Sequence, residues 1–129
     1  MKLLVKADSR YPVDRKKIRV AVEKLLVEHK MSLDVELSLY LVGERKIKEL
    51  KKKYLGIDEV TDVLSFPQDP PSSTRSGTME GHGDVTLGDV VVCYPQAKRQ
   101  ALRFNRLLDD EIEFLVCHGV LHLLGIHHD

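Results

Sequence analysis

The order of hydrophobic and polar residues predicts alternating strands and helices in the first half of the chain. Two runs are typical of strands: a short apolar run at 3–5 and an alternating run at 35–42 that is rich in strand-forming residues. Between them, apolar residues recur at helical spacing over 12–29, and the proline at position 12 suits a first helical turn. Residues 44–54 predict a second helix, which is strongly charged and turns a narrow apolar face inward.

Two further strands are predicted on either side of a long loop. The first covers 60–66 and stops at Pro67, and the second covers 85–93. Gly88 lies inside the second strand, where glycine indicates a bulge or the close approach of another backbone segment. The intervening stretch, 68–84, is rich in proline, glycine and serine, which predicts a loop.

Two helices complete the predicted fold. The first covers about 95–105, and the second covers 110–124 with Asp109 or Asp110 as its N-cap. Strands interleaved with helices indicate an α/β (α+β) fold. We therefore expect a single domain with a central, mixed but mostly parallel sheet of about four strands, with helices around it and no internal repeat.

Length and composition indicate an ordinary cytoplasmic protein. The chain has 129 residues, 43% of them hydrophobic, and no apolar run of about 18 residues that could span a membrane. Its N-terminal apolar stretch is too short for a signal peptide, and two cysteines do not make the disulfide framework of a small secreted domain. We therefore expect a reduced, cytoplasmic protein that has no membrane partner.

Charge is unevenly distributed along the chain, although the net charge is zero. Residues 1–60 carry 15 Lys and Arg against 10 Asp and Glu, whereas residues 61–129 carry 5 against 10. A basic half can attract a polyanion, and solvated helix faces would give the same composition.

The last twelve residues contain four of the six histidines. His118 and His122 lie four positions apart in a predicted helix, which separates them by about 40° around the axis and about 6 Å along it. Gly125 can end this helix with a positive φ, so that the chain doubles back and brings His128 to the same point. Three neutral imidazoles with an open fourth position are typical of catalytic zinc sites, so we expect one Zn²⁺ per chain, although such ligands also accept nickel, copper and iron.

The neighbours of these histidines have alternative roles. His127 competes with His128 as the third ligand, whereas Cys117 points about 100° away around the helix and is expected in the core. Asp129 and Glu111 are candidates to hold a ring N–H group, and Glu111 would equally stabilise the helix N-terminus.

The histidine spacing also occurs in the metzincin peptidase pattern H-E-x-x-H-x-x-G-x-x-H, where the glutamate after the first histidine is the general base. In this chain the corresponding residue is Gly119. A peptidase would lack its catalytic base here, so the pattern favours another kind of hydrolysis.

Three motifs follow one another along the chain: TDVLSFP at 61–67, LGDVVV at 87–92 and HGVLHLLGIHH at 118–128. All three resemble the YbeY family, the bacterial ribosomal RNA maturation factors regarded as zinc-dependent endoribonucleases. The resemblance implies cleavage of single-stranded RNA, in maturation of the 3′ end of small-subunit ribosomal RNA and in ribosome quality control. It also implies the ribosomal small subunit, and ribosomal or assembly-factor proteins, as partners.

The chain departs from the family pattern in several places. The family usually has aspartate where this chain has His127, an arginine thought to touch RNA where it has Leu55, and asparagine where it has Lys51. The family also continues past the third histidine into another helix, whereas this sequence ends at Asp129. We therefore expect either that another element completes the site or that the C-terminus is shortened.

These features together predict a metal-dependent phosphodiesterase that acts on RNA, with zinc held by His118, His122 and His128. The proton acceptor is unassigned among Asp129, Glu111, Asp89 and the 2′-hydroxyl group of the RNA. Phosphate contacts are expected from solvated basic side chains, namely Lys51, Lys52 and Lys53, with Arg99, Arg103 and Arg106 as further candidates.

Two other functions fit the same residues. One is a metallopeptidase or another class of zinc hydrolase, which Gly119 disfavours. The other is a zinc-stabilised ribosome-assembly factor that binds RNA or protein without cutting it. Zinc-dependent activity separates enzyme from scaffold, and RNA against peptide substrates separates the two enzymes.

Overall fold

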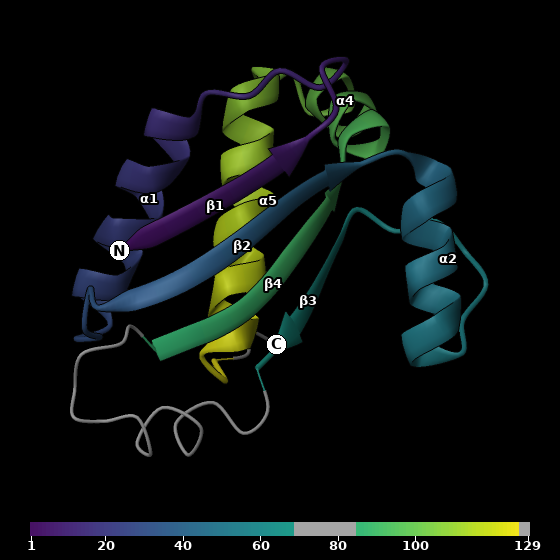
Figure 1. The fold of residues 1–129 in the computed structure, drawn as a ribbon. Coiled ribbons are helices and arrows are strands. Elements are labelled where there is room, and N and C mark those ends of the chain that lie inside the picture. Colours follow the sequence, from purple (N-terminus) through teal and green to yellow (C-terminus); the bar gives the residue numbers. More distant parts are fainter. Residues whose placement is uncertain (69–84, 127–129) are drawn as a thin grey trace.

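The computed structural model describes residues 1–68 and 85–126, which form one sheet with helices packed around it (Figure 1). In chain order the elements are β1 (Lys2–Ala7), α1 (Arg15–Glu28), β2 (Val35–Val42), α2 (Glu44–Leu55), β3 (Val63–Pro67), β4 (Val85–Cys93), α4 (Tyr94–Arg103) and α5 (Leu108–Leu123). This order confirms the predicted α/β single domain.

The sheet is mixed and mostly parallel, as predicted. Its strands lie in the order β1-β2-β4-β3, with β1 parallel to β2 and β2 parallel to β4. The edge strand β3 pairs with β4 in the antiparallel direction. Side chains alternate between the two faces along each strand, so neighbouring residues of β3 and β4 reach different environments.

Two helices cover one face of the sheet, and a third covers part of the other. Helices α1 and α5 pack against the first face, where alternate β2 residues Leu37, Leu39 and Leu41 are buried (Figure 1). Helix α2 lies on the opposite face near β3, with Ile47 packed against Val91 and its neighbours. Around β1 and β2 this second face carries no described helix (Figure 1).

Two helices begin at positions that differ from the prediction. Helix α1 begins at Arg15 rather than near Pro12, because the Asp14 side chain caps it by accepting a 3.0 Å hydrogen bond from the Lys17 backbone N–H. Helix α5 begins at Leu108, with Leu107 at the N-cap position and no capping side chain. The prediction of an aspartate cap for α5 was therefore wrong.

The acidic residues predicted to cap α5 lie inside its first turn instead. Asp109, Asp110 and Glu111 occupy that turn, where negative charge is favourable beside the helix N-terminus. Asp110 also forms a 2.9 Å ion pair with Lys17 of α1, which ties the two helices together.

Strand β3 begins and ends at different residues from those predicted. Strand β3 begins at Val63, three residues later than predicted, and it includes Pro67. Proline is tolerated there because β3 is an edge strand and uses only one side for pairing. The predicted loop at 68–84 lies outside the described residues from position 69 onward.

Gly88 has both features that the sequence predicted for it. Its φ of 136° is strained for any other residue, and a Cβ atom there would lie 2.3 Å from the Phe66 carbonyl oxygen. The pairing register between β2 and β4 shifts at Glu36, beside this glycine. In the described part of the chain, no helix is long and apolar enough to span a membrane.

Candidate functional site

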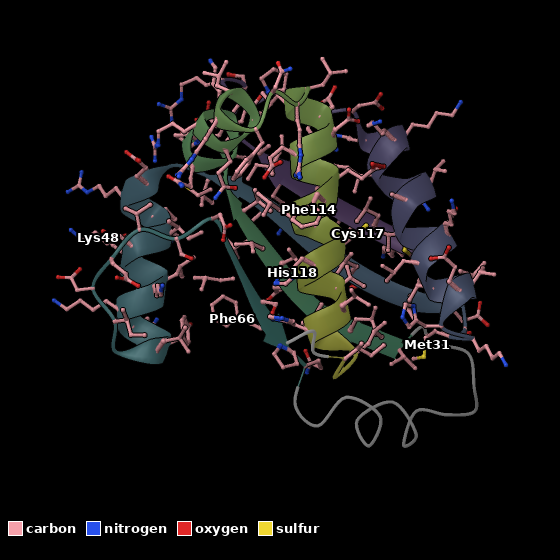
Figure 2. The ribbon with its side chains drawn as sticks, turned by 180° about the vertical axis from the view of Figure 1, so that it is seen from behind. Met31, Lys48, Phe66, Phe114, Cys117 and His118 are labelled. Carbon is pink, nitrogen blue, oxygen red and sulfur yellow. The ribbon has the colours of Figure 1, made fainter. Side chains whose placement is uncertain are left out.

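Helix α5 presents two histidines on one side. The ring centroids of His118 and His122 are 4.5 Å apart, with the ring planes tilted by 53°. Figure 2 shows His118 on the side of α5 that faces β3, whereas Cys117 lies on the side that faces α1. Burial raises the pKa of the Cys117 thiol to about 11, so the thiol is neutral. The residue is only half-buried and lines a groove beside α1, so the prediction of a core position is wrong.

The helix ends at the predicted glycine. Gly125 has a φ of 79°, its N–H donates to the His122 carbonyl at 3.0 Å, and the Ile126 N–H donates to the Leu121 carbonyl at 2.9 Å. This pair of hydrogen bonds is a Schellman motif, which turns the chain away from the helix axis. The candidates His127, His128 and Asp129 follow directly and lie outside the described residues.

The two histidines line a pocket of about 330 Å³, which we call the histidine pocket. Helix α5 contributes His118, Gly119 and His122 to it, residues 61–65 form a second wall, and Lys51 and Leu55 of α2 form a third. The neighbouring segments 51–55 and 61–65 therefore meet the distant second half of α5 at this pocket.

Gly119 allows the helix to lie close to the sheet. A Cβ atom at this position would lie 2.8 Å from Val90 Cγ1 and 3.1 Å from Val90 Cγ2. Position 119, where a metzincin carries its catalytic glutamate, thus faces the buried sheet. A glutamate at this position would meet Val90, so α5 could not lie this close to the sheet.

The donor set in the pocket is compatible with zinc. Neutral imidazole nitrogens are preferred zinc ligands, and His118 and His122 lie on one side of one helix. Within the described residues no three His, Cys, Asp or Glu side chains cluster closely enough to hold a metal ion. The third predicted ligand, His128, lies beyond these residues, so the complete zinc site stays a prediction.

The chain matches a known protein family over most of its length. The family described as Endoribonuclease YbeY matches residues 5–129. The chain belongs to the YbeY family. Over 96 residues it is 43% identical to Endoribonuclease YbeY of Moorella thermoacetica, covering 74% of this chain and 62% of that protein. Over 98 residues it is 43% identical to Endoribonuclease YbeY of Dehalococcoides mccartyi, covering 72% of this chain and 57% of that protein.

The fold is also similar to that of a solved structure. The solution structure of TM1509 from Thermotoga maritima matches 98% of this chain and 75% of that one, with a TM-score of 0.58 and 25% sequence identity. The matched segments span less than two thirds of the two YbeY relatives named above.

The YbeY block TDVLSFP supplies pocket residues that the sequence analysis did not single out. Thr61, Asp62 and Ser65 line the histidine pocket. The Asp62 carboxylate is held in place, since its Oδ2 accepts a 3.1 Å hydrogen bond from Gln100 Nε2. The sequence does carry a signal for them, because polar residues inside a family motif are candidates for the site.

The three candidate lysines separate into two groups. Lys51 lines the histidine pocket, its side chain is only 13% exposed, and its Nζ lies 2.9 Å from Glu59 Oε1. Lys52 and Lys53 are exposed in the last turn of α2. The prediction of three solvated lysines is therefore wrong for Lys51, whose side chain is largely buried and paired with Glu59.

Position 55, where YbeY proteins usually carry arginine, does lie at the site. Leu55 lines the histidine pocket and is 54% exposed. An apolar side chain therefore occupies the place where the family arginine is thought to touch RNA.

The structure does not bring Glu111 to the histidine pocket. Glu111 is 2% exposed, lies two helical turns before His118, and accepts a 2.8 Å hydrogen bond from Arg106 Nη1. The Arg106 guanidinium in turn lies 5.4 Å from the ring centroids of both Phe104 and Phe114. The carboxylate is therefore committed to a structural ion pair.

Asp89 also lies away from the histidines. The neighbouring residue, Val90, faces Gly119 of α5, so Asp89 projects from the opposite face of the sheet. It lines a different pocket there, and burial raises the pKa of its carboxyl group.

The candidate arginines do not line the histidine pocket. Arg99 is paired with Glu44, and Arg106 with Glu111. Arg103 stacks its guanidinium 5.8 Å from the Phe104 ring centroid. Their contact with RNA stays a prediction.

Proposed function

We propose that this chain is a zinc-dependent endoribonuclease that cleaves single-stranded RNA in the histidine pocket. One observation carries the proposal: two imidazoles 4.5 Å apart share a pocket with a lysine and the polar residues of the YbeY block. The relatives that the chain matches bear the name Endoribonuclease YbeY, which supports RNA as the substrate.

In this proposal His118, His122 and His128 hold one zinc ion. When bound there, zinc would lower the pKa of a coordinated water towards neutrality and offset negative charge on the scissile phosphate. Lys51 would hold a phosphate oxygen by direct charge attraction, because it lines the pocket and its ammonium group is oriented by Glu59. The hydroxyl groups of the YbeY block, on Thr61 and Ser65, would donate hydrogen bonds to the same phosphodiester.

Asp62 is the proton acceptor that the pocket favours. Of the candidates in the described residues, Glu111 and Asp89 lie elsewhere, whereas Asp62 lines the pocket and its carboxylate is oriented by Gln100. Asp129 and the 2′-hydroxyl group of the RNA remain alternatives to it.

The biological setting is part of the same proposal. The resemblance to YbeY proteins favours maturation of the 3′ end of small-subunit ribosomal RNA, and ribosome quality control, in the cytoplasm. The ribosomal small subunit, with ribosomal or assembly-factor proteins, would then be the partner.

The central experiment compares RNA cleavage by the wild-type protein and two histidine variants. We expect cleavage of a labelled single-stranded RNA that a chelator stops and added zinc restores. His122→Ala should be inactive but should still bind RNA, whereas His29→Ala should match the wild type, because His29 is an exposed residue at the end of α1. Equal cleavage by wild type and His122→Ala would identify a contaminating ribonuclease and remove the support for an enzyme.

Metal analysis of protein without a His tag tests the ligand set. We expect about one zinc ion per chain. His118→Ala, His122→Ala or His128→Ala should lose it, and Cys117→Ser should retain it. Loss of zinc in His127→Ala with retention in His128→Ala would show that His127 is the third ligand.

Lysine substitutions test how RNA is held. Lys51→Gln should reduce cleavage more than Lys52→Gln or Lys53→Gln, because only Lys51 among these three lines the pocket. Each substitution that removes a phosphate contact should also flatten the dependence of log affinity on log salt by about one unit. Identical effects of the three substitutions would argue against the assigned role of Lys51.

A zinc-stabilised assembly factor without catalysis is the second candidate, and Leu55 is the observation that favours it. An apolar side chain in the pocket removes a charge that would bind phosphate. Leu55→Arg should therefore increase RNA affinity and cleavage if the chain is an enzyme with a weakened site. Cleavage by neither protein, with RNA binding by both, would support the assembly factor. Casein should stay intact with either protein, because position 119, where a metzincin peptidase carries its catalytic glutamate, is a glycine packed against the sheet.

A further inference from the structure

A second pocket lies on the opposite face of the sheet, beside α2. It has a volume of about 290 Å³, and its walls include Tyr40 of β2, Asp89 of β4, Phe66 of β3 and Tyr54 of α2. We call it the sheet-face pocket. Its volume is at the lower end of the range for small-ligand sites, so it suits one small ring system.

The sheet register explains how these residues meet. Asp89 pairs with Ser38 of β2 on one side and with Phe66 of β3 on the other. Residues at these positions project to the same face, which is the face that α2 covers only in part. Figure 2 shows Phe66 on the side of β3 that faces α2. The pocket is therefore built mainly on rigid strands.

Aromatic rings form two sides of the sheet-face pocket. The Tyr54 and Phe66 ring centroids are 5.1 Å apart with planes tilted by 56°, and Tyr54 is 56% exposed. Tyr40 lies on the β2 side, where Lys6 Nζ is 5.6 Å from its ring centroid. Tyr40 and Phe66 on the sheet are half-buried, and Tyr54 on α2 is exposed. Aromatic rings that solvent can reach provide stacking surfaces for unpaired nucleobases, each stacked base contributing about 1–3 kcal/mol.

Asp89 provides the sheet-face pocket with a carboxylate, which is a hydrogen-bond acceptor when ionised. Among the described residues no group donates a hydrogen bond to it, and burial raises its pKa while the charge of Lys6 partly opposes that shift. A ligand that offers two adjacent N–H donors would satisfy this carboxylate. The Watson–Crick edge of guanine presents such a pair, on N1 and N2. Adenine and cytosine place a ring acceptor beside their amino group, and uracil has a single N–H between two carbonyl groups.

The rim of the pocket is basic. Lys46 of α2 lines it, and Lys6 of β1 lies over the outer side of Tyr40. Ammonium groups at this rim would attract the phosphates on either side of a bound base, which supplies affinity without sequence information.

The two pockets are neighbours across the edge of the sheet. Ser65 lines the histidine pocket and the next residue, Phe66, lines the sheet-face pocket. Likewise Leu55 lines the first and Tyr54 the second. An RNA strand that crosses this edge would place a base in one pocket and a nearby phosphodiester in the other.

We propose that the sheet-face pocket binds one unpaired guanine base of the RNA and thereby selects which phosphodiester enters the histidine pocket. The selection step rests on the proposed endoribonuclease function, whereas guanine binding does not.

Equilibrium binding with cleavage-deficient protein tests the proposal. His122→Ala protein would be titrated into two fluorescent oligouridines, one of which carries a single central guanosine, and anisotropy would be measured. We expect the guanosine to increase affinity about tenfold, as a bidentate contact to a base does. Asp89→Asn should abolish this preference, and Glu36→Gln, on the same sheet face but outside the pocket, should preserve it.

Two further measurements complete the test. Tyr40→Leu should weaken binding of both oligonucleotides, since it removes a stacking surface. Guanosine monophosphate should compete only weakly, because it lacks the neighbouring phosphates. Equal affinity for the two oligonucleotides, a preference that survives Asp89→Asn, or competition by the free nucleotide at lower concentration than RNA would overturn the proposal. Circular dichroism would check that each variant is folded. Because these experiments measure binding alone, a failure of guanine binding is distinct from an absence of RNA cleavage by the wild type.

Discussion

Replacing Gly119 by alanine tests whether close contact between α5 and the sheet positions the histidine pair. The added Cβ atom would lie 2.8 Å from Val90 Cγ1 and 3.1 Å from Val90 Cγ2, and 3.5 Å from Val63 Cγ2. Carbon atoms in favourable contact are about 3.5–4.0 Å apart, so the two Val90 contacts are too close and the Val63 contact is normal.

The expected magnitude follows from two opposing effects. Val90 is fully buried in β4 and its β-branched side chain has restricted χ1 freedom, so it cannot easily move aside. Overpacking of this kind costs about 1–3 kcal/mol. Replacing glycine by alanine inside a helix contributes roughly 0.5–1 kcal/mol of stability in the opposite direction. The net result should be a loss of unfolding free energy of roughly 0–2.5 kcal/mol.

A double-mutant cycle separates these two effects. Val90→Ala removes both methyl groups that the new Cβ would approach, while leaving the helix unchanged. In that background Gly119→Ala should stabilise the protein by roughly 0.5–1 kcal/mol, the helix contribution alone. The sign of the substitution should therefore reverse. Urea unfolding of the four proteins, followed by far-UV circular dichroism, measures each free energy.

Equal effects of Gly119→Ala in both backgrounds would refute this reasoning. Such a result would mean that α5 does not lie against Val90, and the arrangement of His118 and His122 beside residues 61–65 would lose its structural basis. Zinc content, measured on the same samples, gives a second reading. Gly119→Ala should bind zinc less tightly than wild type, and the Val90→Ala background should restore part of the affinity.

Three other substitutions test features outside the histidine pocket. Arg106→Met should lower the unfolding free energy by about 1–3 kcal/mol, because it leaves the buried Glu111 carboxylate without its partner. Arg103→Met is the control and should have little effect. Equal urea midpoints for the two variants would exclude the Arg106–Glu111 pair as a stabilising contact. Gly125→Ala should cost about 1–2 kcal/mol, since its φ of 79° is unfavourable for residues with a Cβ atom, and an unchanged thermal midpoint would contradict the observed helix end. Asp89→Asn should stabilise the protein at neutral pH, because burial raises the pKa of Asp89 in the folded state. Wild-type stability should accordingly fall as the pH rises from the unfolded-state pKa of Asp89 through its higher folded-state pKa. Below this pH range Asp89→Asn should no longer be more stable than the wild type. A stability gain that is independent of pH would show that the charge of Asp89 does not cause it.

Much of the secondary structure could be predicted because its signals are local. The alternation at 35–42 corresponds to β2, and the histidine spacing together with Gly125 corresponds to the end of α5. Helix and strand periods, and the freedom of glycine to take positive φ, depend on neighbouring residues alone. The positions where prediction failed, such as the starts of α1 and α5, depend on which group caps the first turn, and several residues in each stretch are able to do so.

The membership of the site was decided by tertiary structure. The sequence placed His118 and His122 on one side of a helix, because four residues make just over one turn. It could not show that Lys51 enters their pocket while Lys52 stays exposed, or that Asp62 lies beside them while Asp89 projects from the opposite face of the sheet. Strand order and the close approach that Gly119 allows determine those outcomes, and both arise from contacts between segments far apart in the chain. A local pattern gives the period of an element, whereas the partner packed against each of its faces is set only when the whole chain folds.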